Sequence, residues 1–561
     1  MSVRAVFVSL SVFLATAVAR AAPGNVEAWQ HTATLRAPKP VVFAGFGSAV
    51  DIDGDTCVIG APEQPGGGFA YVFTRSPTGI WFLQSVLSPA DPGGKFGTVV
   101  AVEGDRIAIG APSHFHEPTG NSGGAAFVFE RSGTTWTQQA ELLASDPHSN
   151  DSFGGSVALD GDTLVVAAGG GDGVVANTGC VYVFTHAGGV WTEAVKLFAA
   201  DGSAGDAYGT SVALDGDTLL VGTPRDSDLG TLAGAAYVLT GSGATWTQQT
   251  KLFASDASAF DGFGGVSLSG DTAAIGAPTA NPMAGSEIGA VYIFTRTGGI
   301  WTEQAALHAP DAEPHDRFGT GLEVEGDRLV ATALFNDAMG NASGAAYVFE
   351  RSAATWTQTA KLIPTDGSAS DDDTMGAVGL SGDTLIVGAH GDGGIPSVTQ
   401  SGSAFAFRLK LQPGTPFCFG DNHSETLHCP CNSSGVTGAP FAGCRNSAHI
   451  EGGWLSATGT TSPNTVLFTC RFLPSNALCM LLRGGLADPG GHIFEDGIRC
   501  IAFGGVRSEK RIFQAVGSVA STTTQSVAPG QTVHYQVVYR DAANYCTPAA
   551  RNISNAYTIV W

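Results

Sequence analysis

The stretch SVALDGDTLLVGTP, Ser211–Pro224, holds the features that decide the fold. Polar and apolar residues alternate as far as Asp215, Gly216 follows, and a run rich in leucine and β-branched residues comes next. Alternation with a period of two is typical of a half-buried strand, and Asp-Gly suits a two-residue hairpin turn because glycine adopts positive φ. We therefore predict a β-hairpin of two strands, Thr210–Leu214 and Thr218–Thr223.

This hairpin belongs to a larger unit that recurs along the chain. Strands expected at Ala235–Thr240 and Trp246–Phe253 complete a unit of four strands. The tryptophan that opens the fourth strand returns every 55 residues, at Trp81, Trp136, Trp191, Trp246, Trp301 and Trp356, and Trp29 fits the same pattern. A marker pair precedes each first strand, at Phe46-Gly47, Phe96-Gly97, Phe153-Gly154, Tyr208-Gly209, Phe263-Gly264, Phe318-Gly319 and Met375-Gly376. Seven units of four short strands predict an all-β propeller.

The two ends of the repeat array each supply part of one unit. The array begins with a lone fourth strand, Trp29–Leu35, and ends on a third strand, Ser403–Leu409. A linear solenoid is the alternative, but it would need atypical capping units at its ends. A closed ring would instead pair the two end strands and protect their edges. We therefore predict seven blades within residues 22–412.

The marker pairs also carry a family resemblance. Phe-Gly followed about a dozen residues later by Gly-Ala-Pro, as at Gly60–Pro62, Gly110–Pro112 and Gly276–Pro278, resembles the FG-GAP repeat. The resemblance implies the seven-bladed propeller of integrin α chains and of many bacterial exported proteins. In integrins the calcium loops lie between first and second strands. Here those turns are too short, with Asp51–Asp55 coming nearest, so we do not expect the integrin calcium sites.

Charge and cysteine content divide the chain near residue 413. The 561 residues carry a net charge of -23, and 43% are hydrophobic, which is enough for buried cores and argues against disorder. So acidic a chain is not expected to bind nucleic acid. Residues 413–561 are nearly neutral, with 9 Lys and Arg against 8 Asp and Glu, yet they hold eight of the ten cysteines. We expect a separate domain there.

The first residues have the anatomy of a secretory signal peptide. Arg4 precedes the apolar run Ala5–Val18, and Ala19–Ala21 offers small residues at the cleavage positions. The run is shorter than the roughly 20 apolar residues that a membrane-spanning helix needs. We therefore expect residues 1–21 to be removed and the mature protein to be secreted or held at the cell surface, without a membrane span.

Residues 413–561 are expected to form a cysteine-rich β-sandwich. Short strands separated by Gly and Pro turns are predicted at Thr465–Phe472, Ala477–Leu482, Ile498–Phe503, Thr532–Tyr539 and Tyr557–Trp561. Eight cysteines in an exported domain allow up to four disulfides: Cys418, Cys429, Cys431, Cys444, Cys470, Cys479, Cys500 and Cys546. A zinc site around Cys429-Pro-Cys431 is the alternative. The cysteine pattern resembles a C-terminal module of exported proteins from planctomycete-like bacteria.

Acidic pairs recur in the long loops between blades. They are Asp146/Asp151, Asp201/Asp206, Asp256/Asp261, Asp311/Asp316 and Asp366/Asp371. Calcium binding is one interpretation, because Ca²⁺ takes 6–8 oxygens and one loop can add carbonyls to two carboxylates. The other is that each Asp caps a turn by bonding nearby backbone. The first four pairs are the candidate Ca²⁺ ligands.

Other conspicuous residues have structural explanations. The repeated tryptophans are expected to pack between blades, and Cys57 and Cys180 to be buried free thiols. His114 and His116 share a long loop with Glu117, but a metal site would need a further ligand, so we expect an exposed polar loop.

Catalytic signals are poor: the sequence contains no HExxH and no P-loop. Long loops on a rigid scaffold are a preferred place for binding sites. We therefore predict a secreted or cell-surface adhesion protein that recognises an extracellular protein or glycan through its long-loop face. The alternatives are an extracellular glycan-active hydrolase or lyase with a central active site, and a passive spacer.

Overall fold

The computed structural model describes residues 26–412 except 92, 116–119, 121, 281–286, 338–342, 364–373 and 392–400, and beyond them the backbone of strands β29–β38. The predicted signal peptide lies outside the described residues. Trp29–Arg408 form one compact unit, and Leu409–Trp561 belong to a second. All regular elements of the described residues are strands, and among these residues there is no apolar helix of membrane-spanning length.

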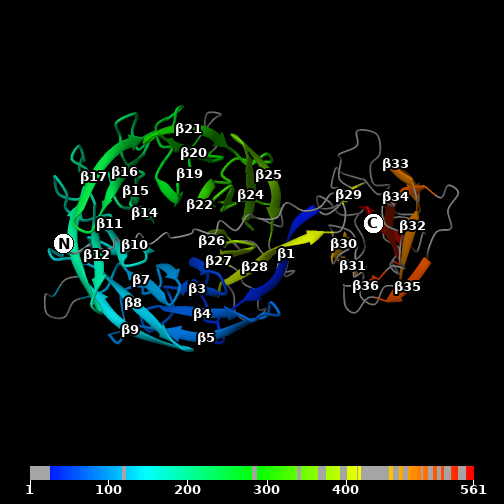
Figure 1. Cartoon of the computed structure of the whole chain (residues 1–561), viewed down its shortest axis with the longest axis horizontal. Coiled ribbons are helices and arrows are strands. Elements are labelled where there is room, and N and C mark those ends of the chain that lie inside the picture. The colour runs from blue at the N-terminus through cyan, green and yellow to red at the C-terminus, as the bar shows by residue number, and fades with distance from the viewer. Residues whose placement is uncertain are drawn as a thin grey trace, which may run out of the picture. The chain divides into compact units, whose positions relative to one another are not determined.

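Seven four-stranded antiparallel sheets form the first unit, arranged as a ring of blades (Figure 1). Blade 1 contains β2 (Ala49–Asp53), β3 (Thr56–Ala61), β4 (Phe69–Arg75) and β5 (Trp81–Leu87); blade 2 contains β6 (Val99–Glu103), β7 (Arg106–Ala111), β8 (Ala125–Ser132) and β9 (Thr135–Leu142). Blade 3 contains β10 (Phe153–Asp160), β11 (Thr163–Ala168), β12 (Cys180–Ala187) and β13 (Val190–Leu197); blade 4 contains β14 (Ser211–Asp215), β15 (Thr218–Thr223), β16 (Ala235–Ser242) and β17 (Thr245–Leu252).

The remaining blades repeat this order. Blade 5 contains β18 (Gly265–Ser269), β19 (Thr272–Ala277), β20 (Ala290–Thr297) and β21 (Ile300–Leu307); blade 6 contains β22 (Phe318–Glu325), β23 (Arg328–Ala333), β24 (Ala345–Ser352) and β25 (Thr355–Leu362). Blade 7 contains β26 (Met375–Ser381), β27 (Thr384–Ala389), β28 (Ser403–Gln412) and, from the other end of the chain, β1 (Val26–Leu35). The predicted strands of blade 4 differ from the observed ones by at most two residues at either end.

Blade 7 closes the ring as predicted. Its strand order is β1-β28-β27-β26, so the N-terminal strand lies beside the last strand of the repeats. The Thr32 hydroxyl donates a hydrogen bond to the carbonyl of Ala406 at 3.0 Å across this seam. The closed ring with four strands in every blade confirms the all-β propeller and excludes the linear solenoid for residues 29–408.

The two halves of the FG-GAP pattern meet between neighbouring blades. Each marker aromatic is buried beneath an aromatic of the third strand, as where the rings of Phe263 and Tyr292 stand edge to face, 5.5 Å apart. A Cβ on Gly222, in the Gly-Ala-Pro position of blade 4, would stand 1.8 Å from the carbonyl oxygen of Gly264, the marker glycine of blade 5. The backbones therefore touch where both residues are glycine, which explains why these two positions recur together.

A ring of seven hydrogen bonds links the first strands on one face of the propeller. In each blade the backbone N–H of the hairpin glycine donates to the last side chain of the preceding blade's first strand. The donors, in order, are Gly54, Gly104, Gly161, Gly216, Gly270, Gly326 and Gly382, and their acceptors are Ser381, Asp53, Glu103, Asp160, Asp215, Ser269 and Glu325. The hairpin turns thus fasten each blade to the next around the whole ring.

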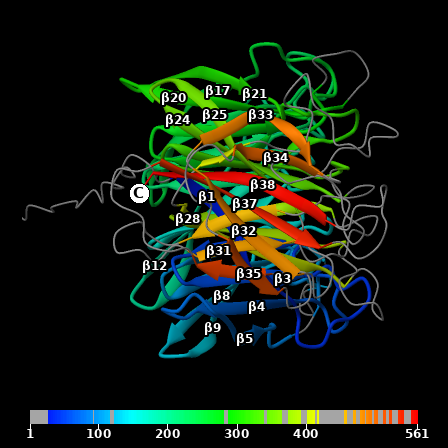
Figure 2. The same cartoon turned by 90° about the vertical axis from the view of Figure 1, so that its right-hand side faces the viewer.

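The described strands of the second unit form three sheets. One has the order β29 (Thr415–Phe417), β38 (Arg551–Val560), β37 (Thr532–Arg540), β32 (Leu478–Gly484) and β35 (Lys510–Gln514). The others pair β30 (Trp454–Thr458), β31 (Leu467–Arg471) and β36 (Ala520–Thr523), and β33 (Leu486–Phe494) with β34 (Gly497–Ala502). Figure 2 shows several of these strands, among them β32, β37 and β38. The sandwich and its disulfides stay predictions, because the cysteine side chains of this unit lie outside what the structure describes.

Candidate ligand-binding face

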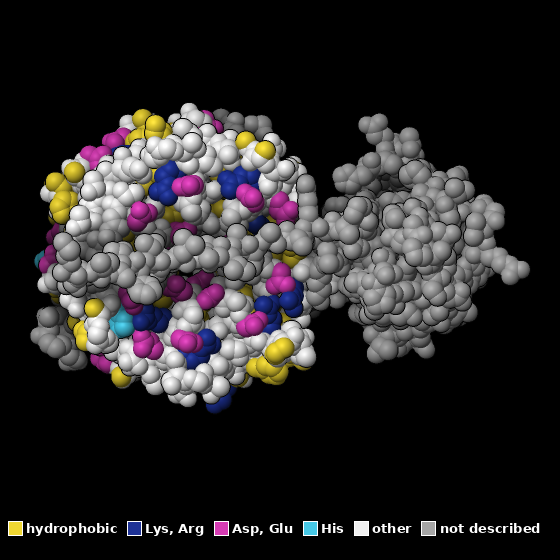
Figure 3. All heavy atoms as spheres, viewed as in Figure 1, with side chains coloured by type: hydrophobic (Ala, Val, Ile, Leu, Met, Phe, Trp, Pro, Cys, Tyr) yellow, Lys and Arg dark blue, Asp and Glu magenta, His cyan; other side chains and the backbone are white. Residues whose placement is uncertain are grey.

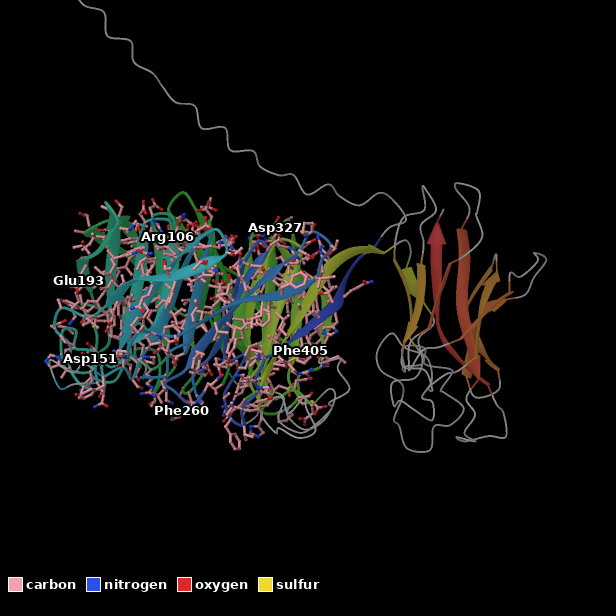
Figure 4. The ribbon with its side chains drawn as sticks, turned by 90° about the horizontal axis from the view of Figure 1, so that it is seen from below. Arg106, Asp151, Glu193, Phe260, Asp327 and Phe405 are labelled. Atoms are coloured by element: carbon pink, nitrogen blue, oxygen red, sulfur yellow. The ribbon has the colours of Figure 1, made fainter. Side chains whose placement is uncertain are left out.

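The propeller has two unlike faces. On one face lie the loops that join the second strand to the third and the loops that join each blade to the next. We call it the long-loop face. The tight-turn face carries the Gly-Asp hairpins and the links from third to fourth strands. Figure 4 shows Asp151 and Phe260 at one edge of the propeller and Arg106 and Asp327 at the opposite edge. Candidate site residues are therefore assessed face by face.

The first member of each described acidic pair fastens its loop to the blade that follows. Asp146 accepts a hydrogen bond from the Tyr182 hydroxyl at 2.7 Å and an ion-paired hydrogen bond from Lys196 at 2.8 Å. We call this three-residue arrangement the latch. It recurs as Asp201–Tyr237–Lys251 and Asp311–Tyr347–Lys361, and as the pair Asp256–Tyr292.

The latch changes the ionisation of its members. Partial burial opposes the charged form of Asp146, but the hydrogen bonds from Lys196 and Tyr182 outweigh it and lower the pKa of this carboxyl. The pKa of the Tyr182 hydroxyl is raised, chiefly by burial and also by the neighbouring Cys180 and Asp146. The latch therefore holds an ionised Asp and a neutral tyrosine, both hydrogen-bonded within the protein.

The second member of each pair caps a turn. Asp151, Asp206, Asp261 and Asp316 are all buried. Each accepts a hydrogen bond from a backbone N–H three residues earlier, at His148, Ser203, Ser258 and Glu313, over 2.6–2.9 Å. Burial raises the pKa values of Asp151 and Asp206, the backbone bond partly opposing it. These contacts match the turn-capping interpretation of the sequence.

Calcium binding stays a prediction. Within the described ranges no three His, Cys, Asp or Glu side chains are grouped so as to hold a metal ion. Asp366 and Asp371 lie outside those ranges. In each of the four described pairs the first aspartate belongs to a latch and the second caps a turn. The two carboxylates of a pair are therefore not arranged as one set of ligands.

Blade 2 departs from the latch, and one expectation there is wrong. Phe127 replaces the latch tyrosine, and Glu141 stands where blades 3, 4 and 6 have lysine. His114 fills the space: it is buried, its ring meets Phe127 edge to face, and its Nε2 lies 3.4 Å from the Glu141 carboxylate. The expected exposed histidine is thus a core residue, because the aromatic and the acid beneath it provide a partly apolar niche. His116 and Glu117 lie outside the described residues.

The long-loop face also exposes a series of large apolar side chains. They come from the loops of blades 1–5: Val42, Phe43, Phe115, Leu143, Val174, Val175, Phe198, Leu229, Leu232 and Phe260. Apolar groups left in water contribute nothing to the core, and ten of the sixteen exposed large apolar side chains of the described residues lie on this one face. Three of them, Leu143, Phe198 and Phe260, lie on loops whose aspartate bonds the tyrosine of the next blade.

The tight-turn face is occupied by ion pairs. The aspartate of a Gly-Asp turn accepts from an arginine near the end of the third strand, as in Asp105–Arg131, Asp271–Arg296 and Asp327–Arg351 at 2.6–2.7 Å. Figure 3 looks onto this face, where basic and acidic side chains alternate around the ring. This face therefore combines ion pairs with carboxylates that accept from the hairpin glycines, so acidic groups outnumber basic ones among its described residues.

The repeated tryptophans lie between blades, as predicted. Trp136, Trp301 and Trp356 are buried, and each indole N–H donates to a glutamine of the preceding blade at 2.7–3.0 Å. The arginines of the tight-turn face lie over these rings, for example Arg131 over Trp136 at 5.0 Å. Cys57 and Cys180 are buried free thiols, and burial raises the pKa of Cys180 to about 11.

Two carboxylates occupy equivalent positions on first strands at the centre of the ring. Asp51 lies on β2 and Glu323 on β22, and blade 7 between them places Gly379 at the same position. Burial, opposed by hydrogen bonds from the Val102 and Ile52 N–H groups, raises the pKa of Asp51 to about 6. Burial together with repulsion from Asp51 and Glu325 raises the pKa of Glu323 to about 8. The pair therefore favours holding a proton at neutral pH.

Geometry and sequence together define the class of protein: a seven-bladed propeller with one exposed, loop-built face and one sealed by ion pairs. The FG-GAP repeat family model matches residues 29–73, 136–184, 191–239, 246–294, 301–349 and 356–407. These matches cover more than half of the chain, which therefore belongs to the FG-GAP repeat family. Blade 2 falls largely outside the matched ranges, yet it has the same four strands. Among curated proteins, none matches the sequence.

Sequence reasoning found the acidic pairs but missed their partners. The latch tyrosine is the fourth residue of the GAAYVF-type marker, and the latch lysine precedes the leucine near the end of the fourth strand. Blades 3–6 all have this tyrosine together with an acidic pair, whereas blade 2 has phenylalanine and a single Asp91. Blade 1 has Tyr71 without a pair, and blade 7 has Phe405 after the pair Asp366/Asp371, so the co-occurrence was only a partial signal.

Proposed function

We propose that this chain is a secreted or cell-surface binding protein that recognises an extracellular partner through the long-loop face. The observation that carries the proposal is the concentration of exposed large apolar side chains on the loops of blades 1–5. The opposite face offers ion pairs that already satisfy one another. A protein partner agrees with these apolar groups better than a glycan, because a glycan needs many polar partners.

The latches support the proposal by fixing the loops. A loop held by an ion pair and a tyrosine hydrogen bond loses less conformational freedom when a ligand binds, so less binding energy is spent on ordering it. The propeller beneath is braced by the ring of glycine hydrogen bonds. A rigid scaffold that presents exposed loops is the usual setting of a recognition site.

The test compares matched apolar residues on the two faces. Phe43, Phe115 and Leu229 are changed together to serine on the long-loop face, and Ile80, Val190 and Ile300, equally exposed, are changed on the tight-turn face. The full chain and both variants are applied to arrays of extracellular proteins and glycans, with and without calcium. We expect the first variant to lose at least tenfold in affinity for array ligands. Equal losses in both variants would contradict the proposal.

A glycan-active hydrolase is a second candidate, favoured by Asp51 and Glu323. Glycosidases use a protonated and an ionised carboxyl side by side, and the two pKa values differ in that direction. The Glu323→Gln variant separates the candidates: it should abolish any hydrolysis of a polysaccharide panel and leave array binding unchanged. Hydrolysis that persists in the variant would exclude this pair as the catalytic groups.

A further inference from the structure

A pocket of about 380 Å³ lies on the long-loop face between blades 4 and 5. Arg225 and Leu232 come from the loop between the second and third strands of blade 4, Phe260 from the loop that leads into blade 5, and Thr279 and Glu287 from the corresponding loop of blade 5. Its size lies within the roughly 300–1,000 Å³ range of small-ligand sites. The pocket is therefore large enough for a side chain with a neighbouring charged group.

Phe260 stands at this pocket in a backbone conformation that does not suit it. It has φ 72° and is 59% exposed. The blades themselves supply a comparison: the equivalent position three residues before the marker aromatic also has positive φ at Phe43, Gly93, Asn150, Gly205 and His315. Glycine and asparagine adopt this conformation readily, whereas a bulky residue is strained by it. Most of the Phe260 ring is exposed at the pocket mouth, so the ring is available to cover an apolar group that enters the pocket.

The pocket contains one cation without an acidic partner. Glu287 is engaged by Arg317 at 3.2 Å and lies 3.7 Å from His315. Arg225 is exposed, and no carboxylate of the described residues lies within ion-pair distance of its guanidinium. The Thr279 hydroxyl donates to the Phe260 and Asp261 carbonyls and so has no proton left for a ligand. Arg225 is the donor that remains.

We propose that this pocket binds a peptide segment in which a carboxylate lies next to a large apolar side chain. Arg225 would pair with the carboxylate, and Phe260 and Leu232 would cover the apolar group. A sugar fits less well, because its hydroxyls would find few free donors or acceptors here. This inference rests on the proposed function and names the ligand class of one subsite on the long-loop face.

The experiment uses a matched pair of probes, N-acetyl-phenylalanine and its uncharged amide, titrated into the full chain and followed by NMR. We expect the acid to bind about threefold to tenfold tighter than the amide, and Arg225→Gln to remove this difference. Phe260→Asn should weaken both probes without lowering the melting temperature, because Asn150 already occupies the equivalent position in blade 3. Ile300→Asn, at an exposed apolar residue of the tight-turn face, is the control and should leave both affinities unchanged.

The outcomes separate this inference from the proposed function. Equal binding of acid and amide, no binding at the solubility limit of the acid, or insensitivity to both Arg225→Gln and Phe260→Asn would each overturn the pocket assignment. Array binding that is lost in the triple serine variant but retained in Arg225→Gln and Phe260→Asn would leave the proposed function standing and refute this subsite.

Discussion

The two faces of the propeller are built from the same seven repeats and yet use them differently. On the tight-turn face arginine, aspartate and tryptophan recur in four blades and satisfy one another, while blades 3 and 4 have His186 and Gly241 in place of the arginine. On the long-loop face the backbone is repeated, but exposed side chains such as Phe43 and Phe260 replace glycine or asparagine in particular blades. Repetition of a satisfied contact indicates a role in the scaffold. A departure that costs stability indicates a role in recognition.

The largest expected effect is at the contact between blades, beneath the long loops. Gly222→Ala would place a Cβ 1.8 Å from the Gly264 carbonyl, so the two blades would have to separate. We expect a loss of more than about 3 kcal/mol in the free energy of unfolding, measured by urea denaturation. Gly216→Ala, on the tight-turn face, is the control: nothing lies within 4 Å of its added Cβ, and its φ of 59° alone should cost about 1 kcal/mol. Equal costs would refute the close-contact explanation.

The latch is tested next, because the result separates a structural role of Asp146 from a role in ligand binding. Asp146→Ala removes the acceptor of both Tyr182 and Lys196. We expect a loss of about 1–2 kcal/mol in unfolding free energy and faster hydrogen exchange in residues 143–152. Since the pKa of Asp146 is lowered in the folded state, this contribution should be present at neutral pH and disappear as the pH falls below the ordinary aspartate pKa.

Two measurements could contradict the latch. Asp105→Ala, which breaks a single exposed ion pair on the tight-turn face, should cost less than about 1 kcal/mol. If it costs as much as Asp146→Ala, the latch is no stronger than a surface pair. If calcium raises the melting temperature of the wild type but not of the Asp146→Ala variant, the aspartate is a metal ligand.

Glu323 tests the centre of the ring, which connects the two faces. Its raised pKa means that the folded state binds its proton more tightly, so stability is lost as pH rises from about 4.5, the ordinary value, through about 8. Glu323→Gln should therefore be more stable than wild type by about 1–2 kcal/mol at pH 9, after allowing for the partial exposure of Glu323 to solvent, and equal to it at pH 4. Denaturation at both pH values checks this. A variant less stable than wild type at pH 9 would show that the charge is compensated.

The repeat made the fold predictable, whereas the site depended on contacts between units. Trp246 and Asp215-Gly216 mark strand and turn within 55 residues, and seven copies exclude most other folds. The role of Asp146 depends on its contacts with Tyr182 and Lys196, which lie on two strands of the following blade. The pocket at Phe260 was hidden for a different reason: only the backbone shows that this position has positive φ in every described blade. The sequence of one loop does not reveal that phenylalanine is strained there.

The smallest expected effect comes from the arginines of the tight-turn face. Blade 4 lacks this arginine and serves as a natural comparison. Arg296 pairs with Asp271, lies over Trp301 and donates to Thr218 of the preceding blade. Gly241 occupies its place in blade 4, opposite Trp246, and that blade still folds with all four strands. Arg296→Gln should therefore cost at most about 1 kcal/mol, mostly screened in 1 M salt, and should leave array binding unchanged. A larger loss that salt does not reduce would mean that packing on Trp301, rather than charge, fastens this face.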